Sequence, residues 1–442
     1  MLLEISVENF RSIKEKQTLS FEATKDTHLE DYYVVEVGEY RVLRALSILG
    51  ANASGKSNIL KVFPLLRRLV LTSPSSKSNL IKFDPFVLDA EWKNRDTIID
   101  VSFLCDERKY QYTITLNNKF IRREELRCKP FGAKTHTVFT RTTDNDGIKS
   151  IVKWKGKYNQ AEARKLEVNL TANTTVFGAY QRTNTDLPWM KSIIEFFEDV
   201  MLPNITPGEQ GLDDYTTKSI LGKKVDKNQV LDLMHRADVG VDGIDVKKET
   251  KDLPKELVEM LLNDDNTPEE LKQKLKESPT SNDYIVRLSH SGNGSSILMD
   301  FDEESMGTQR YYSLSSVLLQ LINQEKFVAI DELEYRLHPD LYQFFIRTFL
   351  TNKSNSQIVY TTHNREFLND KDLFRNDSVY ITEKSDTGAT ELYSVTDFGT
   401  DTIRNTTNIF NAYKAGRLGG IPRIGGTYIK QTNYNNDGEN NQ

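Results

Sequence analysis

The sequence predicts an α/β fold that combines an antiparallel β layer, a parallel core sheet and a short helical insertion. Strand-like and helix-like apolar runs alternate near both ends of the chain, residues 80–180 carry short β-type runs, and residues 188–278 turn helical. The chain accordingly divides into a first lobe (1–185), a helical insertion (186–282), a second lobe (283–385), a C-terminal segment (386–430) and a disordered tail (431–442).

Composition is that of an ordinary soluble globular protein. The 442 residues are 38% hydrophobic and 28% charged, and no apolar run approaches the roughly 18 residues of a membrane span. The N-terminus alternates Leu3, Ile5 and Val7 with polar residues, which favours a strand over a signal peptide. We therefore expect a cytoplasmic protein without a membrane role.

Charge and cysteine content narrow the function classes. The net charge of −6 argues against a molecule that attracts nucleic acid over its whole surface, although a local basic patch remains open. Cys105 and Cys128 lie in separate segments without a CxxC or Cys/His grouping. This spacing fits a reducing compartment and argues against a zinc site.

The first lobe begins with predicted strands and turns. The last of these strands is the apolar run 42–49, and a helical pattern follows it directly. Apolar positions recur with helical spacing over residues 57–71, where Pro64 is expected to kink the helix. The β-type runs of residues 80–180 follow, with turn chemistry at Asn117-Asn118. We read them as the antiparallel layer.

The junction between that strand and helix carries the strongest motif. Residues Gly50–Ser57 read GANASGKS and fit the pattern GxxxxGK[ST] between a predicted strand and a predicted helix. Loop N–H groups would cradle the phosphates of ATP, Lys56 would neutralise their charge, and the Ser57 hydroxyl would ligate Mg²⁺. An ordinary glycine turn would leave Lys56 unexplained. The predicted cofactor-binding residues are Gly50, Asn52, Ser54, Gly55, Lys56, Ser57 and Asn58.

The helical insertion and the second lobe have different patterns. Helical runs between residues 188 and 278 are short and broken by Pro and Gly, and no heptad is sustained, so a long coiled-coil arm is not expected. Beyond residue 283 strand and helix alternate again. The predicted elements are the strand IVRLS, a helix at 308–323, the strand FVAI, a helix after Pro339, and the strands QIVY and VYITE.

The strand FVAI ends in two carboxylates, Asp331 and Glu332. At the carboxyl end of a parallel strand beside the phosphate loop, Asp331 would hold Mg²⁺ and Glu332 would orient or deprotonate the attacking water. Any strand that runs out of a protein core can end in charged residues. The two carboxylates therefore indicate an ATP site only in combination with the loop Gly50–Ser57. We predict Glu332 as a catalytic residue and Asp331 as a metal ligand.

The long separation of Lys56 from Asp331 is the arrangement of ABC-type ATPases, and three further segments resemble that class. In Glu304–Arg310, Ser305 and Gly307 precede a helix and resemble the signature that binds the γ-phosphate of the opposite subunit; the alternative is a helix cap with a glycine turn. His363 follows the strand QIVY and resembles the catalytic switch histidine, although a histidine there is also commonly structural. Leu337–Pro339 falls where the D-loop of this class lies.

Two further residues extend the predicted site. Asn9–Ser12 resembles the Phe-Arg-Ser element of RecF and SMC heads, whose arginine approaches the nucleotide. The alternative is that Arg11 is a surface arginine at the end of a strand. Gln181, between the β layer and the helices, takes the place of a Q-loop glutamine that would reach the metal.

Together these segments resemble the ABC-type (SMC-, RecF- and OLD-like) AAA ATP-binding proteins of bacterial abortive-infection and phage-defence operons, the group of RloA, AbiL and the PARIS ATPase. The resemblance implies a P-loop ATPase head that uses ATP and Mg²⁺ and acts as a head-to-tail dimer or higher oligomer. It also implies a separate toxic effector of Toprim or RloB type and a phage protein or nucleic acid as trigger. The signature departs from the common LSGGQ pattern by carrying Met306 and Arg310. Further matching segments are 84–89, 110–112, 237–240 and 416–422.

Three functions remain open at this point. The first is an ATPase that senses infection and controls a toxic effector. The second is a DNA-repair ATPase of RecF or SMC type that binds DNA directly. The third is a binding module that uses ATP as structural glue and hardly hydrolyses it. Steady-state hydrolysis separates the third from the others, and salt-sensitive DNA binding favours the second.

Overall fold

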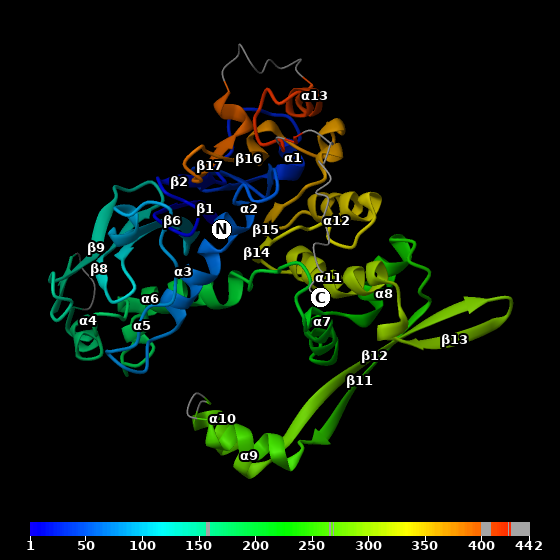
Figure 1. Cartoon of the computed structure of the whole chain (residues 1–442), viewed down its shortest axis with the longest axis horizontal. Coiled ribbons are helices and arrows are strands. Elements are labelled where there is room, and N and C mark those ends of the chain that lie inside the picture. Colours follow the sequence, from blue (N-terminus) through cyan, green and yellow to red (C-terminus); the bar gives the residue numbers. More distant parts are fainter. Residues whose placement is uncertain (156–159, 265–266, 268, 399–407, 423, 426–442) are drawn as a thin grey trace, which may run out of the picture.

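The computed structural model describes residues 1–155, 160–264, 267, 269–398, 408–422 and 424–425 (Figure 1). An antiparallel sheet lies beside a parallel core sheet, and a narrow ribbon extends away from both (Figure 1). The mixed α/β architecture predicted from the sequence is confirmed.

The antiparallel layer is a seven-stranded sheet in the order β10-β9-β8-β7-β6-β1-β2. Its strands are β1 (Leu2–Glu8), β2 (Gln17–Ser20), β6 (Thr97–Cys105), β7 (Arg108–Leu116), β8 (Ile121–Pro130), β9 (His136–Thr143) and β10 (Ser150–Trp154). Buried and half-buried residues alternate along β7, as expected for a sheet with one face on the core. The layer ends earlier than predicted, because helical segments follow residue 160, and it takes in the two N-terminal strands.

The core sheet has the order β14-β15-β5-β16-β17. The strands β14 (Phe327–Ile330), β15 (Gln357–Thr361), β5 (Ala45–Gly50) and β16 (Val379–Lys384) are parallel, and β17 (Thr390–Ser394) is antiparallel to β16. All residues of β5, β14 and β15 are buried, which explains their continuous apolar sequences. The carboxyl ends of β5, β14 and β15 therefore meet at one edge, where Gly50, Asp331 and Thr361 lie.

Helices on this sheet confirm three predictions. The helix after β5 is divided into α2 (Lys56–Leu60) and α3 (Val62–Leu71). Pro64 explains the break, because it lacks an N–H and its ring excludes the carbonyl of Leu60 from a helical position. The predicted helices at 308–323 and after Pro339 are α11 (Met306–Asn323) and α12 (Pro339–Thr351).

Shorter elements lie outside the two sheets and outside residues 243–300. They are α1 (Glu30–Tyr33), β3 (Val34–Val37), β4 (Tyr40–Leu43), η1 (Trp92–Asn94), α4 (Gln160–Lys165), η2 (Leu166–Val168), α5 (Val176–Tyr180), α6 (Pro188–Glu195), η3 (Phe196–Val200), α7 (Leu212–Leu221), α8 (Lys227–Arg236), η4 (Phe301–Glu303), η5 (Arg365–Asn369), η6 (Asn376–Ser378), η7 (Val395–Asp397) and α13 (Ile409–Lys414). Within the described residues, no helix is both long and apolar enough to cross a bilayer.

The helical insertion predicted for residues 186–282 is partly wrong. Residues 243–252 form strand β11 (Gly243–Asp252), which pairs over ten residues with β12 (Thr280–Gly292). The strand IVRLS belongs to this ribbon and not to the core sheet; β13 (Ser295–Asp300) pairs with β12 as well. Both faces of β11 are solvated over most of its length, so its sequence lacks the alternation that marks a strand.

The ribbon and the helices at its far end, α9 (Lys255–Asn263) and α10 (Glu269–Glu277), form an arm that projects from the body (Figure 1). Ten paired residues extend it by about 34 Å at the usual rise of a strand. The sequence analysis excluded a long coiled-coil arm. It did not predict a projecting element of any other kind. We call residues 243–292 the arm.

One ion pair ties the arm to the start of α11. The Nε2 atom of His290 lies 2.6 Å from Oε1 of Glu304, whose side chain is buried, and Nδ1 lies 2.6 Å from the carbonyl oxygen of Gly240. The hydrogen bond to Glu304 raises the pKa of His290 against the opposing effect of burial. Glu304 directly precedes Ser305, so the base of the arm is fixed to the predicted signature.

This pair predicts a pH-dependent stability. Because the pKa of His290 is raised in the folded state, the ion pair contributes fully to the stability of the fold below the ordinary histidine pKa of about 6.5. This contribution is lost as pH rises through the raised pKa. We expect His290→Gln to lower the melting temperature by about 1–3 °C at pH 6 and by less at pH 9. His235→Gln, an exposed histidine on α8, is the control. An equal loss at both pH values would contradict the assignment.

Candidate functional site

The loop Gly50–Ser57 lies between β5 and α2, as the motif predicts. Its backbone takes positive φ angles at Gly50 (153°), Ala53 (61°) and Gly55 (108°). A β-carbon at Gly50 or Gly55 would collide with Thr382 or Thr390 of the β16–β17 hairpin. Glycine is therefore required both by the conformation and by the close approach of that hairpin.

Hydroxyl groups hold the loop from two sides. The Oγ atom of Ser54 lies 2.6 Å from Oγ1 of Thr382, and Thr390 donates to the Ser54 carbonyl oxygen at 2.8 Å. The Oγ1 atom of Thr390 also lies 2.7 Å from Oγ of Ser12, which accepts a hydrogen bond from Asn58 Nδ2 at 2.8 Å. The loop conformation is thus fixed by side chains distant in sequence.

The same contacts place Arg11 near the first turn of α2. Arg11 adjoins Ser12, and its guanidinium lies 3.4 Å from the Asp84 carboxylate. Its Nε atom is buried and has no hydrogen-bond partner. The structure therefore brings the predicted Arg11 to the side of the loop on which Asn58 lies.

Lys56 is buried beneath the loop. Its Nζ donates to the carbonyl oxygens of Gly50 at 2.8 Å and Ala51 at 3.0 Å. Burial lowers the pKa of Lys56 to about 8, and the carboxylates of Asp331, Glu332 and Glu334 oppose this shift. Lys56 is mostly protonated at neutral pH and is held by neutral acceptors that a phosphate group can replace.

Asp331 and Glu332 are joined through Thr361, a residue without a predicted role. The Thr361 hydroxyl donates to Asp331 Oδ1 at 2.6 Å and accepts from the Glu332 N–H at 2.7 Å. Glu332 has a φ of 48°, a left-handed conformation that costs a non-glycine residue about 1–3 kcal/mol. Thr361 thus fixes Asp331 and stabilises the turn that presents Glu332. Its only sequence signal is its place at the end of a strand before Thr362-His363.

His363 lies beside these carboxylates. Its Nε2 atom is 3.9 Å from Oε1 of Glu332, and its backbone N–H donates to Glu334 Oε1 at 2.5 Å. Burial, followed by the charge of Lys56, lowers the pKa of His363. The neutral imidazole can therefore donate one hydrogen bond and accept another at neutral pH. The second Glu334 oxygen is buried without a hydrogen-bond partner.

These residues fit Mg-ATP. No hydrogen bond within the described residues uses the N–H groups of Gly55, Lys56 and Ser57, so they are available to phosphate oxygens. The Ser57 hydroxyl and the Asp331 carboxylate supply oxygens of the kind that Mg²⁺ prefers. Two protein ligands suffice, because bound phosphates and water commonly complete the magnesium shell. Asn52 is exposed at the tip of the loop.

The predicted signature is not brought to the loop of its own chain. Ser305 caps α11, since its Oγ accepts a hydrogen bond from the Thr308 N–H at 3.1 Å. Within the described residues, no hydrogen bond or ion pair joins residues 304–310 to Gly50–Ser57. The N-terminal end of α11, with Gly307 and the 58% exposed Met306, is open to a partner.

The structure contradicts the prediction of Gln181 as a metal ligand. Gln181 follows α5, which packs against the C-terminal end of α3 through a hydrogen bond from Thr175 Oγ1 to the Leu69 carbonyl oxygen. The phosphate loop lies at the opposite end of the α2–α3 segment (Figure 1). Residues 201–205 instead run beside β14, and Ile205 accepts from the Asp331 N–H at 2.8 Å. Nothing in the sequence marks that segment.

A cavity of about 710 Å³ adjoins the loop, and its lining corrects a second expectation. Gly50, Asn52 and His363 line it together with Tyr413 and Ile421 from the C-terminal segment. Every site residue predicted from the sequence precedes residue 386, so the C-terminal segment was not expected at the ATP site. The C-terminal segment instead forms part of the wall of this cavity, and β17 braces the phosphate loop.

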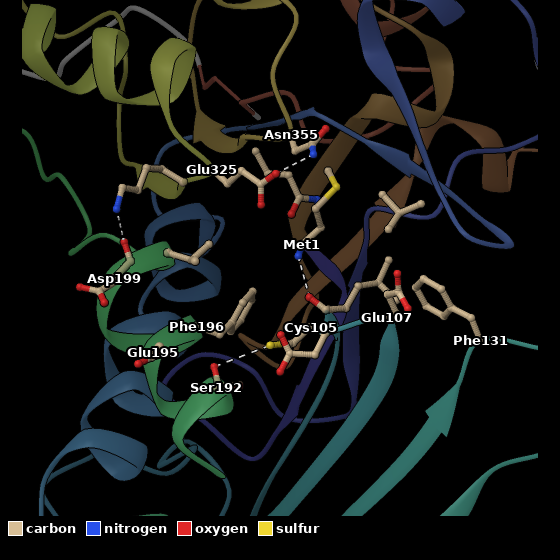
Figure 2. A pocket seen from close by; sticks show the side chains of 16 residues that line it. Met1, Cys105, Glu107, Phe131, Ser192, Glu195, Phe196, Asp199, Glu325 and Asn355 are labelled. Carbon is tan, nitrogen blue, oxygen red and sulfur yellow. Dashed lines mark hydrogen bonds between the residues drawn. The ribbon is translucent and has the colours of Figure 1, made fainter. Parts of the chain in front are cut away.

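A second cavity, of about 420 Å³, differs in chemistry (Figure 2). Its lining includes Asp106, Glu107, Glu195, Asp199 and Glu325. The Met1 amine donates to the Leu104 carbonyl oxygen at 2.9 Å, and Lys326 donates to that of Asp199 at 2.6 Å (Figure 2). Five carboxylates disfavour a polyphosphate by repulsion. Of these two cavities, the one lined by Gly50, Asn52 and His363 is therefore the better candidate for a polyphosphate.

The role of Thr361 can be tested by isosteric substitution. Thr361→Val leaves Asp331 Oδ1 and the Glu332 N–H without their common partner, and we expect it to destabilise the fold by about 1–3 kcal/mol. We also expect turnover of ATP to fall at least tenfold while nucleotide still binds Lys56. Thr361→Ser keeps the hydroxyl and is the matched control. Equal turnover in the Val and Ser variants would show that Thr361 does not position these carboxylates.

Comparison with known proteins identifies the family. Two solved structures align over 89% of this chain: an SMC head bound to the C-winged helix domain of ScpA (TM-score 0.43, 11% identity, 97% of that chain) and the SMC head of Thermotoga maritima (0.39, 12%, 98%). No curated protein matches. The family model described as AAA ATPase domain matches residues 1–368, which include the loop, Asp331, Glu332 and His363. The chain belongs to this family of AAA ATPase domains.

Proposed function

We propose that the chain is an ABC-type ATPase that binds Mg-ATP at Gly50–Ser57 and hydrolyses it between two copies. The observation that carries this proposal is the convergence of Lys56, Asp331, Glu332 and His363 at one edge of the core sheet. Lys56 neutralises the phosphates, while Ser57 and Asp331 would hold Mg²⁺, which would supply positive charge to the phosphoryl group during its transfer.

Glu332 and His363 supply the remaining chemistry. The Glu332 carboxylate accepts a hydrogen bond from the attacking water and orients it towards the terminal phosphate. The neutral His363 imidazole, 3.9 Å from that carboxylate, donates a hydrogen bond to the terminal phosphate. The release of the terminal phosphate after hydrolysis therefore changes the hydrogen bonds of both residues.

The location of the signature supports a head-to-tail dimer. Ser305 and Gly307 lie at the N-terminus of an 18-residue helix, where N–H groups and the helix dipole favour an anion. The phosphate loop of the same chain follows β5, and β5 comes after β14 and β15 in the sheet order. A second copy, turned head to tail, places its signature over the terminal phosphate and closes the site.

The biological role that we propose is control of a separate toxic effector in anti-phage defence. The motif resemblance supports it, as does the arm, which offers a contact surface away from the ATP site. Leu257, Met260 and Leu271 on its two helices are 38%, 65% and 42% exposed. ATP-dependent dimerisation can control an effector of Toprim or RloB type if that effector prefers one of the two states.

Substitutions separate binding from turnover. We expect Lys56→Ala to abolish nucleotide binding, because it removes the cation beneath the loop. Glu332→Gln should keep ATP binding and reduce hydrolysis at least a hundredfold, and Gly307→Asp should allow binding but block dimerisation by repelling phosphate. Fluorescent-nucleotide binding and phosphate release measure the two effects. Normal turnover in Lys56→Ala and Glu332→Gln would refute the site.

The defence role requires a cellular test. The gene is expressed with and without its genomic neighbours, cells are challenged with phage, and the Lys56→Ala variant is included in each arm. We expect protection only with the neighbours and with an intact ATP site. Protection by this chain alone, together with nuclease activity of the purified chain that survives Lys56→Ala, would contradict it. Tight, salt-sensitive DNA binding by the chain alone would favour the repair function.

A further inference from the structure

The cavity beside the phosphate loop is lined mostly by polar and charged groups. Besides residues of that loop and of the C-terminal segment, its lining includes Arg365, Glu383, Lys384, Ser385 and Asp386. Two cations and two carboxylates thus share a volume of about 710 Å³. An anionic ligand has to approach one of the cations and avoid the carboxylates. The surroundings of the four charges therefore decide where such a ligand can bind.

Three of these charges belong to the carboxyl end of β16 and the turn after it, namely Glu383, Lys384 and Asp386. The Glu383 carboxylate accepts a hydrogen bond from the Tyr393 hydroxyl at 3.3 Å, and the Lys384 side chain is exposed. An exposed lysine with a carboxylate on either side in the sequence binds phosphate weakly, because water and the neighbouring negative charges screen it. Lys384 is therefore a poor anchor for an anion.

Arg365 comes from a different element and has different surroundings. It begins the turn η5, two residues after His363, and its side chain is half-buried. Within the described part of the chain, its guanidinium makes no hydrogen bond and no ion pair. A guanidinium has five N–H donors and stays charged at every physiological pH. Arg365 therefore has the capacity to bind an anion that enters the cavity.

Local contacts fix the backbone of Arg365 beside the phosphate loop. The Thr362 N–H donates to the Ile48 carbonyl oxygen at 3.1 Å, which ties the segment after β15 to the strand that leads into that loop. Asn364 caps η5, since its Oδ1 atom accepts a hydrogen bond from the Glu366 N–H at 3.0 Å. The position of Arg365 relative to the end of β5 is thus set by the core sheet.

The neighbours of Arg365 show which end of the nucleotide it adjoins. Gly50 and His363 line the same cavity, and His363 lies 3.9 Å from the carboxylate of Glu332, which we assign to the attacking water. On the opposite wall, burial raises the pKa of Tyr413 to about 12, and the charge of Arg365 opposes this rise. Arg365 therefore lies at the end of the site where the terminal phosphate of ATP is expected.

We propose that Arg365 binds the terminal phosphate of ATP within the same chain and lets the site distinguish ATP from ADP. The inference rests on the proposed Mg-ATP site and adds to it a residue that detects the terminal phosphate. The planar guanidinium can donate two parallel hydrogen bonds to phosphate oxygens, a geometry that lysine cannot provide. Release of the terminal phosphate leaves Arg365 without a partner again, whereas Lys56 returns to its two backbone carbonyls.

Nucleotide affinities test this assignment. ATP and ADP, each with Mg²⁺, compete with a fluorescent nucleotide for the Glu332→Gln chain, in which ATP stays intact during the measurement. We expect Arg365→Gln to weaken ATP binding at least tenfold and to change ADP binding less than twofold, because only ATP loses a charge-assisted contact. Arg365→Lys keeps the charge but not the paired N–H groups, so it should recover only part of the ATP affinity.

Two controls separate this contact from general effects of charge and stability. Arg417 is exposed and is absent from the lining of the cavity among the described residues, so Arg417→Gln should leave both affinities unchanged. The melting temperature of nucleotide-free Arg365→Gln should equal that of the parent, because the substitution removes no hydrogen bond within the described chain. A lower melting temperature together with loss of both affinities would assign Arg365 a structural role instead.

The remaining outcomes distinguish the inference from the function on which it rests. Equal loss of ATP and ADP affinity in Arg365→Gln, an unchanged ATP affinity, or the same loss in Arg417→Gln would overturn the role of Arg365 and leave the proposed ATP site standing. A Glu332→Gln parent that binds neither nucleotide would instead refute the ATP site itself.

Discussion

The candidate site depends on the hydroxyl of Thr361. It donates to Asp331 at 2.6 Å and accepts from the backbone of Glu332 at 2.7 Å, so one side chain on β15 fixes the proposed metal ligand and the proposed catalytic carboxylate that follow β14. The left-handed backbone at Glu332 is tolerated because this hydrogen bond and the one from the Leu333 N–H to the Thr361 carbonyl oxygen hold the turn. His363 follows two residues later, which couples its position to the same strand end.

The phosphate loop has a comparable dependence on the C-terminal part of the chain. Thr382 and Thr390 contact Ser54, and their packing excludes side chains at Gly50 and Gly55. Both threonines lie beyond residue 368, where the match to the family model ends. The phosphate loop at the proposed ATP site is therefore braced by residues outside the matched region, and Gly420, Ile421 and Pro422 line the cavity beside it.

The arm and the signature are connected by a short physical path. His290 at the base of the arm is paired with Glu304, and Gln309 donates to the Glu304 carbonyl oxygen at 3.1 Å. A displacement of the ribbon has to break the pair or move the first turn of α11. Contact between the arm and the proposed effector would thus bias the position of the predicted signature, and the proposed ATP-dependent dimerisation would bias the arm by the same coupling free energy.

The sequence by itself determined the α/β class, the loop at Gly50–Ser57, the carboxylates after β14 and the order along the chain of β5, α11, β14, α12, β15 and β16, because these features depend on local periodicity and on motifs read within a few residues. Only the tertiary structure decided the rest. Thr361, Thr382 and Thr390 acquire their roles through contacts across parallel strands or across more than 300 residues. Strand β11 was misread because a ribbon solvated on both faces has no apolar alternation, and Gln181 was misplaced because chain order does not show at which end of α3 a helix packs.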